Sequence, residues 1–324
     1  MKTLRIEVDP WNPSGELMAR AADVLREGGL VAFPTETVYG LGANALNPEA
    51  VKGIYRAKGR PSDNPLILHL SRVKQAEPLV HVDERARRLM RAFWPGPLTL
   101  VLRARDVVPL AARGGLSTVA LRMPSHPVAS ALIDAAGFPL AAPSANVSGR
   151  PSPTDAETVW ADLQGRIEMI LDGGPVSVGI ESTVIDVSEE LPLLLRPGGM
   201  PAEEIEDFLG EPLRHPDGRS SRRSPGTRYR HYAPTIPVRV WHPEAPFEAT
   251  GMELERWGFM GLTVPPAHFG RALRFESVEN YARGLFSGFR ALEAEGLLGI
   301  VAEWPPASGV GLGLRDRIRR AEQA

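Results

Sequence analysis

The sequence predicts an α/β protein built in two parts, and three observations indicate this. The chain of 324 residues is long enough for two hydrophobic cores. Short apolar runs typical of buried strands alternate with amphipathic segments typical of helices. Residues 211–236 interrupt this alternation, because Pro, Ser, Gly and Arg dominate there and the apolar period stops. We therefore expect a first domain over 1–210, a linker over 211–236 and a small domain over 237–324.

Capping residues mark the expected helices of the first part. Ser14 can cap a helix that runs to about Glu27, where two glycines end it. Asn47 precedes a helix that begins with proline, a residue favoured at the first helical position. Further helices are expected at about 83–94, 126–136, 155–163 and 201–209.

Strands are expected where a short apolar run lies between these helices. Leu30–Phe33 is such a run, and Pro34 breaks it. The others cover 65–70, 98–102, 118–123, 139–142, 167–171, 182–187 and 191–195. After the linker, strand and helix alternate, which favours a small, mostly parallel sheet. Its strands are expected at 238–241, 259–264 and 297–302, and its helices at 277–295 and 314–324.

The composition is that of an ordinary globular protein, with 43% hydrophobic and 23% charged residues. The absence of cysteine excludes disulfides, thiolate nucleophiles and cysteine-ligated zinc. No apolar run reaches about 18 residues and the start has no secretory apolar core, so we expect no membrane span and a cytoplasmic location. The net charge of −2 gives the whole molecule no field for nucleic acid.

The densest group of polar motifs lies around the first two predicted strands. Lys58 and Arg60 follow a helix, where they could hold a triphosphate or form a solvated pair at the helix C-terminus. Asn64 and His69 flank a strand, so that Asn64 could reach a nucleotide and His69 a carboxylate. Taken alone, His69 also fits a satisfied core histidine. Together these groups suit an anionic ligand rich in oxygen, such as a nucleotide or an amino acid.

Hydroxyl side chains add to this group. Thr35, Thr37 and Tyr39 alternate along the chain, so in an extended segment they would share one face. The alternative is an ordinary edge strand, in which such residues are common. Glu181 and Ser182, directly before a later strand, could face the same cleft.

Further residues of the same kind follow the later strands. Ser144 and Asn146 lie on a turn after a strand of small residues, where Ala142 would let a ligand approach the backbone. The alternative is an ordinary Pro-Ser-Asn turn. Arg122 and Arg196 each follow an apolar run, where an arginine either clamps an anion or caps the strand end at the surface.

Several well-known motifs are absent from the sequence. There is no phosphate loop of the Gly-x-x-x-x-Gly-Lys-Ser/Thr type and no strand-linked Gly-x-Gly-x-x-Gly. His, Asp and Glu do not cluster at metal-ligand spacing, and the Gly-x-Ser-x-Gly elbow of hydrolases is missing. A nucleotide would therefore be bound by an unusual arrangement.

Taken together, these motifs resemble the threonylcarbamoyl-AMP synthase family in its long two-domain form. The matching motifs occur in the family's order along nearly the whole chain, at 34–42, 58–61, 64–70, 143–146, 181–184, 224–234 and 309–321. The last of these includes Arg317. The resemblance implies a YrdC-like first domain, a twisted mixed sheet with a large open cleft. It also implies a smaller Rossmann-like parallel α/β domain at the C-terminus.

The resemblance also implies a reaction. L-threonine, bicarbonate and ATP would give L-threonylcarbamoyl-AMP and pyrophosphate, for N6-threonylcarbamoyladenosine next to the anticodon of tRNA. The product would pass to a separate tRNA threonylcarbamoyl transferase complex. Mg2+ would arrive on the ATP phosphates, with no protein side chain as its ligand, and no organic cofactor is expected.

Particular residues receive roles from the same resemblance. Threonine would contact Thr37, His69, Arg122, the Ala142 backbone and Ser182. ATP would contact Arg60, Asn64, Thr118, Ser144, Asn146, Ser152, Arg196 and Tyr232. Lys58 and Arg60 would be catalytic, because cations offset the repulsion between two reacting anions. We expect their replacement by alanine to lower activity while the fold survives. The sequence identifies no general base, and a mobile linker ending in Tyr232 could close the cleft as a lid.

Two other functions remain open from the sequence. Six arginines face one acid between Arg214 and Arg230, so the linker could bind the phosphate backbone of tRNA directly, or it could be a solvated linker. A carbamoyl- or phosphoryl-transfer enzyme of related fold with another acceptor is the second alternative. A salt titration of tRNA binding tests the first, and exchange of threonine for serine or carbamoyl phosphate tests the second.

Overall fold

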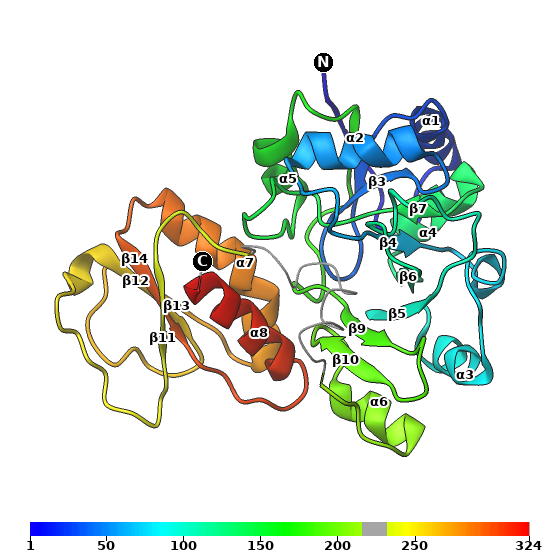
Figure 1. Ribbon diagram of the computed structural model, residues 1–324. Coiled ribbons are helices and arrows are strands. Elements are labelled where there is room, and N and C mark those ends of the chain that lie inside the picture. The colour runs from blue at the N-terminus through cyan, green and yellow to red at the C-terminus, as the bar shows by residue number, and fades with distance from the viewer. Residues whose placement is uncertain (216–231, 324) are drawn as a thin grey trace.

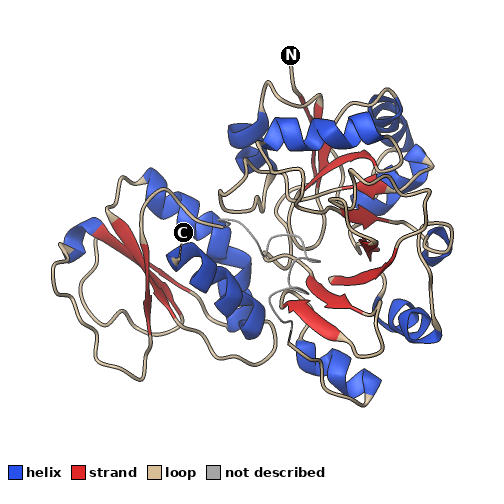
Figure 2. Ribbon diagram, viewed as in Figure 1, coloured by secondary structure: helices blue, strands red, loops and turns tan. Residues whose placement is uncertain are grey.

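The computed structural model describes residues 1–215 and 232–323, which form two separate sheets with their helices (Figures 1 and 2). The larger sheet has ten strands in the order β1-β8-β2-β3-β7-β4-β6-β5-β9-β10 and mixes parallel with antiparallel pairs. The smaller sheet has four strands in the order β11-β14-β12-β13, all parallel. The predicted fold class is therefore confirmed. The limits 1–210 and 237–324 remain our proposal for the two domains.

The larger sheet takes its elements from the first part of the chain. Its strands are β1 (Leu4–Glu7), β2 (Val31–Phe33), β3 (Gly40–Asn44), β4 (Ile67–His69), β5 (Leu98–Arg103), β6 (Thr118–Arg122), β7 (Leu140–Ala141), β8 (Met169–Asp172), β9 (Thr183–Asp186) and β10 (Leu193–Arg196). The helices beside it are α1 (Gly15–Arg26), α2 (Pro48–Lys58), the short 3-10 helix η1 (Val73–Gln75), α3 (Glu84–Phe93), α4 (Pro127–Ala136), α5 (Ala156–Leu163) and α6 (Ala202–Leu209).

The smaller sheet follows the linker. Its strands are β11 (Val238–Trp241), β12 (Trp257–Gly261), β13 (Arg271–Arg274) and β14 (Gly299–Glu303). Its helices are the 3-10 turn η3 (Leu254–Arg256), α7 (Val278–Ala294) and α8 (Gly311–Glu322). Both long helices lie on the side of this sheet that faces the larger unit (Figure 1). They bury the predicted stripe of Tyr281, Leu285, Phe289 and Leu292.

Helix ends follow the predicted chemistry in most cases. The Asn47 side chain accepts hydrogen bonds from two backbone N–H groups in the first turn of α2, and Gly59 ends that helix with φ of 62°. Ser14 occupies the cap position of α1, but its hydroxyl makes no capping hydrogen bond among the described residues. The expected capping role of Ser14 is therefore wrong, although the helix is present.

Three strands of the structure were not predicted from the sequence, namely β1, β3 and β13. β1 and β13 lie at sheet edges and are largely exposed, so neither has the apolar run of a buried strand. β3 lies inside the sheet but begins Gly40-Leu41-Gly42, a composition typical of a turn. A Cβ at Gly42 would lie 2.8 Å from the Phe33 ring, so the close packing of this strand requires glycine.

The register of β4 and β6 decides which side chains share a face. These strands are parallel, with Ile67 opposite Ala120 and His69 opposite Arg122. Alternate residues point to opposite sides of a strand, so Leu68 enters the main core while these four point to the other face. The polar ends of two neighbouring strands thereby meet on one face of the sheet.

The two units approach each other closely at two glycines. A Cβ at Gly179, whose φ is +87°, would lie 2.2 Å from the Arg283 Cα in α7. A Cβ at Gly313 in α8 would lie 2.8 Å from the Gly198 Cα. Backbone therefore packs on backbone across the interface, which requires glycine at both positions. Among the described residues, no helix combines the length and apolarity needed to cross a membrane.

Candidate active site

A pocket of about 580 Å3, counting the part open to solvent, lies over the face of the large sheet that carries His69 and Arg122. The loop after β2, the ends of β4, β6 and β10, the turn after β7 and the segment before β9 form its walls. Its lining residues are Thr35, Thr37, Val38, Gly40, Arg60, Leu66, Ile67, His69, Arg122, Ala142, Pro143, Ser144, Glu181, Ser182, Arg196 and Tyr232.

The structure brings together most of the predicted site residues. All those predicted for threonine line the pocket, namely Thr37, His69, Arg122, Ala142 and Ser182. Four of those predicted for ATP do so as well, namely Arg60, Ser144, Arg196 and Tyr232. The remaining predicted residues are not in this lining, namely Lys58, Asn64, Thr118, Asn146 and Ser152.

Arg122 is buried and held from three sides. Its Nη2 lies 2.8 Å from Glu36 Oε1, its Nη1 donates to Thr37 Oγ1 at 2.9 Å, and its Nε donates to the Gly96 carbonyl at 3.2 Å. These contacts fix the plane of the guanidinium, which suits bidentate recognition of a carboxylate. The prediction did not include Glu36, although it stands within the polar motif between Thr35 and Thr37.

The three alternating hydroxyls do not share one face, because residues 34–39 form a turn and not a strand. Thr35 and Thr37 line the pocket, but Tyr39 lies in the core and donates to the Gly174 carbonyl at 2.7 Å. The predicted grouping is therefore wrong for Tyr39. Since Thr35 donates its proton to the Val38 carbonyl, the 2.9 Å contact between the two threonines requires Thr37 as donor. The Thr37 oxygen can thus only accept from a ligand.

His69 is buried and neutral. Burial first, and then the charge of Arg122, lower its pKa to about 3. Its Nδ1 lies 3.2 Å from the Ile67 carbonyl, which can only accept, so Nδ1 carries the proton and Nε2 keeps a lone pair. A neutral acceptor suits an ammonium or hydroxyl of a ligand. This differs from the predicted contact with a carboxylate.

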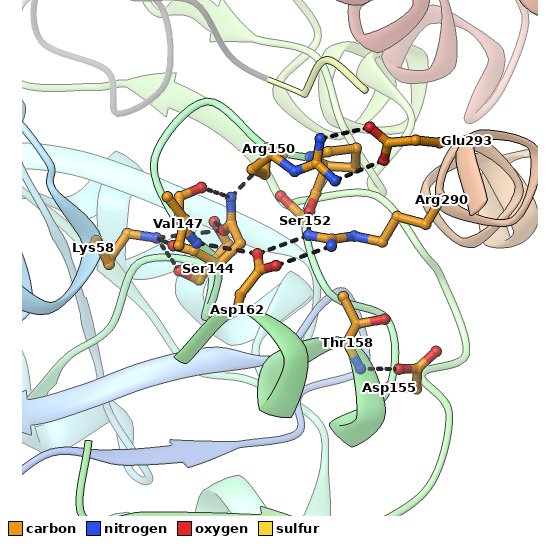
Figure 3. A network of polar contacts seen from close by, with 12 residues as sticks. Lys58, Ser144, Val147, Arg150, Ser152, Asp155, Thr158, Asp162, Arg290 and Glu293 are labelled. Atoms are coloured by element: carbon orange, nitrogen blue, oxygen red, sulfur yellow. Dashed lines mark hydrogen bonds and ion pairs between the residues drawn. The ribbon is translucent and has the colours of Figure 1, made fainter. Parts of the chain in front are cut away.

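Lys58 points toward the loop after β7 (Figure 3), and it is not among the residues that line the pocket. Its side chain is 1% exposed, and its Nζ donates to the carbonyls of Ser144 and Asn146, both at 2.5 Å. Burial, and then the charge of Arg60, lower the pKa of Lys58 well below its ordinary value. Lys58 is therefore not the solvated cation of a helix end. Arg60, in contrast, is part of the pocket wall and donates to the Pro65 carbonyl at 3.0 Å.

Asn64 is a buried amide whose polar atoms are unused. Neither its Oδ1 nor its Nδ2 has a hydrogen-bond partner within residues 1–215 and 232–323. Its backbone carbonyl, in contrast, accepts from the Tyr55 hydroxyl at 3.2 Å. A buried amide in this state costs stability, so it is typical of a position that binds a ligand.

Thr118 stands at the other end of β6 from Arg122, on the same face of the sheet. It lines a separate surface depression together with His81 and Arg103. Four residues along a strand span about 13 Å, so only an extended ligand could contact both ends of β6.

Glu181 joins the pocket to the second unit. Its Oε1 accepts from the Ser152 hydroxyl at 2.5 Å, and its Oε2 accepts from Arg317 Nε at 2.6 Å. Burial alone would raise the pKa of Glu181, but Arg317 and Arg196 lower it, so the carboxylate is ionised. Ser152 therefore donates its only hydroxyl proton to Glu181, so toward a ligand its oxygen can act only as a hydrogen-bond acceptor.

Arg317 comes from α8 and has no exposed side-chain surface. It also donates to the Pro197 carbonyl at 3.0 Å and lies 5.0 Å from the centre of the Tyr232 ring. The prediction assigned this arginine no role in the site, because only the packing of the two units brings it to Glu181. The second unit thus completes one wall of the pocket.

Tyr232 is the residue at which the described chain resumes after the linker. Its φ of 70° is unusual for a residue with a side chain, and it is the one non-glycine residue with positive φ in the described part of the chain. Its ring stacks on Phe286 of α7 with centroids 5.6 Å apart. Such a conformation persists only where neighbouring contacts hold it, and it is typical of functional sites.

Two carboxylates at this pocket are paired with arginines. Glu36 pairs with Arg122, and Glu181 pairs with Arg317. Within the part of the chain that the structure describes, no group of three or more His, Asp or Glu could hold a metal ion. The pocket offers cations and hydrogen-bond acceptors, which suit an anion that also carries N–H or O–H groups.

Comparisons with known proteins cover nearly the whole chain. A family model described as telomere recombination (Sua5, YciO and YrdC) matches residues 23–198, and one described as the C-terminal domain of threonylcarbamoyl-AMP synthase matches residues 200–322. The chain is 48% identical to a threonylcarbamoyl-AMP synthase of Pyrococcus abyssi, covering 93% of this chain and 92% of the relative. It is 45% identical to that of Bacillus subtilis, covering 99% and 98%. The crystal structure of P. abyssi Sua5 complexed with L-threonine matches with a TM-score of 0.91 at 44% identity, covering 99% of this chain and 98% of that one.

Proposed function

The chain belongs to the threonylcarbamoyl-AMP synthase family, and we propose which of its residues carry out the reaction of that family. The enzyme makes L-threonylcarbamoyl-AMP and pyrophosphate from L-threonine, bicarbonate and ATP, for the modification of tRNA. The convergence of Thr37, His69, Arg122, Ser144 and Arg196 on one pocket carries the proposal. A relative of this fold has been crystallised with L-threonine, which supports binding of the amino acid here as well.

The threonine end of the pocket is formed by Arg122 and the acceptors around it. The fixed guanidinium of Arg122 matches the carboxylate of the amino acid. The lone pairs of His69 Nε2 and Thr37 Oγ1 match its ammonium and hydroxyl protons. Ser182 and the Ala142 backbone complete this end. A zwitterion with a hydroxyl uses every one of these groups.

The ATP end holds phosphates with cations and the nucleoside with polar acceptors. Arg60 and Arg196 line the pocket and can bind phosphate oxygens. The buried Asn64 amide has one donor side and one acceptor side, which suits the edge of a base. Ser152 can only accept, so it suits a ribose hydroxyl and not a phosphate oxygen.

The remaining residues proposed for ATP are spread over a distance that only an extended nucleotide can span. Ser144 lines the pocket and Asn146 follows in the same loop, which Lys58 holds from behind. Thr118 lies further along the sheet face, within reach of an extended ligand only. Tyr232 closes the opposite wall.

The chemistry requires two anions to meet. The ammonium of threonine must first give up a proton to solvent. The neutral amine then forms an N–C bond either with CO2, which releases a second proton, or with bicarbonate, which releases water and no further proton. A carboxylate oxygen of the resulting carbamate then bonds to the α-phosphorus, and the bond to pyrophosphate breaks. Arg60 and Arg196 would offset the repulsion, with Mg2+ carried on the phosphates of the substrate. A pKa of about 3 makes His69 a poor proton acceptor, so we assign it an orienting role.

Three earlier expectations remain predictions. The product would pass to a separate tRNA threonylcarbamoyl transferase complex, and the enzyme would work in the cytoplasm. Direct binding of tRNA rests on linker arginines, of which Arg219, Arg222, Arg223, Arg228 and Arg230 lie outside the described residues.

Pyrophosphate release tests the proposed function. We expect the release from ATP to require both threonine and bicarbonate, and serine to replace threonine poorly. Release that ignores threonine, or that prefers carbamoyl phosphate, would instead favour a transferase with another acceptor.

Replacement of Lys58 by Met should weaken ATP binding and lower stability together. The variant keeps the length of the side chain but leaves the buried carbonyls of Ser144 and Asn146 without their donor. We expect the KM for ATP to rise about 30-fold and the melting temperature to fall by about 5 °C. Steady-state kinetics and thermal unfolding measure both. An unchanged KM for ATP in a folded variant would contradict the role of Lys58 behind the loop.

Replacement of His69 by Asn should make the stability of the protein toward unfolding less sensitive to mild acid. The folded-state pKa of about 3 lies below the ordinary 6.5, so between these values the unfolded chain takes up a proton that the folded chain does not. Stability is therefore lost as the pH falls through this window. From pH 7 to pH 5 this loss should be about 2 kcal/mol larger in the native protein than in the variant. Urea denaturation at both pH values measures it, and equal losses would show that His69 is not buried as a neutral ring.

A further inference from the structure

The loop over residues 144–152 needs support from elsewhere in the molecule. It carries Ser144, Asn146 and Ser152, three of the residues proposed for ATP, yet lies outside every helix and strand named above. Such a segment keeps one geometry only where other groups hold it, because ordering a backbone costs conformational entropy. Lys58 holds its inner side, and Figure 3 shows that the outer side faces Arg290 and Glu293, two side chains of the second unit.

Arg290 of α7 binds both the loop and the helix behind it. Its Nη1 and Nη2 lie 3.0 and 2.8 Å from the two carboxylate oxygens of Asp162 in α5. Its Nη2 also donates to the Pro151 carbonyl at 2.7 Å. Asp162 in turn accepts from the Val147 backbone N–H at 3.2 Å. One mostly buried guanidinium thus fixes two points of the loop.

Glu293, one turn further along α7, binds the loop from a second direction. It accepts from both terminal nitrogens of Arg150, at 2.8 and 2.6 Å. It also accepts from the backbone N–H of Thr235 at 2.7 Å and from the Thr235 hydroxyl. Burial alone would raise the pKa of Glu293, but these hydrogen bonds lower it to about 2. The carboxylate therefore ties the loop to the segment that follows Tyr232.

We propose that Arg290 and Glu293 are positioning residues for the nucleotide, through which the second unit holds the ATP-binding loop in its working geometry. The inference rests on the proposed assignment of Ser144, Asn146 and Ser152 to ATP. Among the described contacts, neither Arg290 nor Glu293 touches a residue proposed for threonine. Loss of this support should therefore weaken the binding of ATP and leave the binding of threonine nearly unchanged.

The test compares three single variants on one helix. Glu293→Gln and Arg290→Met each remove one support. Glu295→Gln is the matched control, because Glu295 ends the same helix in an exposed pair with Arg271. We expect the KM for ATP to rise about tenfold in the first two variants, with less than a twofold change in the KM for threonine and in every constant of the control. Isothermal titration of each substrate separately gives a second readout.

The results separate this inference from the proposed function. If the native protein releases no threonine-dependent pyrophosphate, the proposed function fails, whatever the variants do. If the native protein is active and the folded variants show unchanged ATP affinity, or equal losses for both substrates, the inference is overturned. Should Arg290→Met fail to fold, Arg290→Lys decides the question, because it keeps the charge but cannot bind Asp162 and Pro151 in the same fork geometry.

Discussion

Replacement of Arg60 by Ala should abolish most pyrophosphate release while the protein stays folded. Arg60 lies on the pocket wall, where it donates hydrogen bonds to two backbone carbonyls, those of Asn64 at 3.4 Å and Pro65 at 3.0 Å. Burial lowers its pKa to about 10, so it remains charged at neutral pH. A cation that stabilises phosphoryl transfer is worth a factor of about 1,000 in rate, and we expect kcat/KM to fall by about that factor.

The control for Arg60 lies in the preceding helix. Arg56→Ala in α2 removes an exposed arginine of the same segment and should leave both kcat and the melting temperature unchanged. Arg60→Lys should recover part of the rate, because it restores the charge without the planar fork. A fold that collapses in Arg60→Ala, or an activity that survives it, would mean that Arg60 has a structural role only.

Replacement of Arg317 by Ala should have the largest effect on stability. The side chain is fully buried and its loss would leave the Glu181 carboxylate without its arginine partner. Removal of one partner of a buried ion pair costs about 3–5 kcal/mol. Because Arg317 also contacts the Pro197 carbonyl and the Tyr232 ring, the pocket wall should loosen and activity should fall as well. Chemical denaturation and steady-state kinetics measure the two effects.

A double variant separates the two roles of Arg317. Glu181→Gln with Arg317→Met removes both charges of this pair, while Asp316, the second carboxylate beside Arg317, keeps its ion pair with Arg320. The double variant should therefore recover much of the stability. It should not recover activity, since the Tyr232 ring loses the Arg317 guanidinium beside it and Ser152 loses the charge of its acceptor. Arg319→Ala, an exposed arginine of the same helix, is the control for loss of charge in α8. A double variant with full activity would show that Arg317 has no positioning role.

Most of the fold could be predicted because its signals are local. Apolar runs mark the buried strands, and Asn47, Asp83 and Gly59 mark helix ends through their own hydrogen bonds or backbone conformation. β3 could not be predicted in this way, because its glycines are required by close packing against the Phe33 ring, which lies on another strand. Linker residues 216–231, with their arginines and His231, lie outside the described part of the chain.

The site was predictable only in part, for a related reason. The motifs predict many of the residues that face the pocket, because their order along the chain resembles that of a known family. Tertiary contacts then decide what each residue does. The prediction placed Lys58 at the phosphates, but the structure puts it under a loop. Glu36 and Arg317 become part of the site only through Arg122 and Glu181, two partners far away in sequence.

One measurement tests most directly whether this pocket joins the two substrates. A crystal structure with L-threonine and a non-hydrolysable ATP analogue should show the amino-acid carboxylate on Arg122 and its hydroxyl or amine at His69. The phosphates should lie beside it, between Arg60, Arg196 and Ser144. A nucleotide bound outside this pocket, or a threonine that contacts neither Arg122 nor His69, would contradict the account.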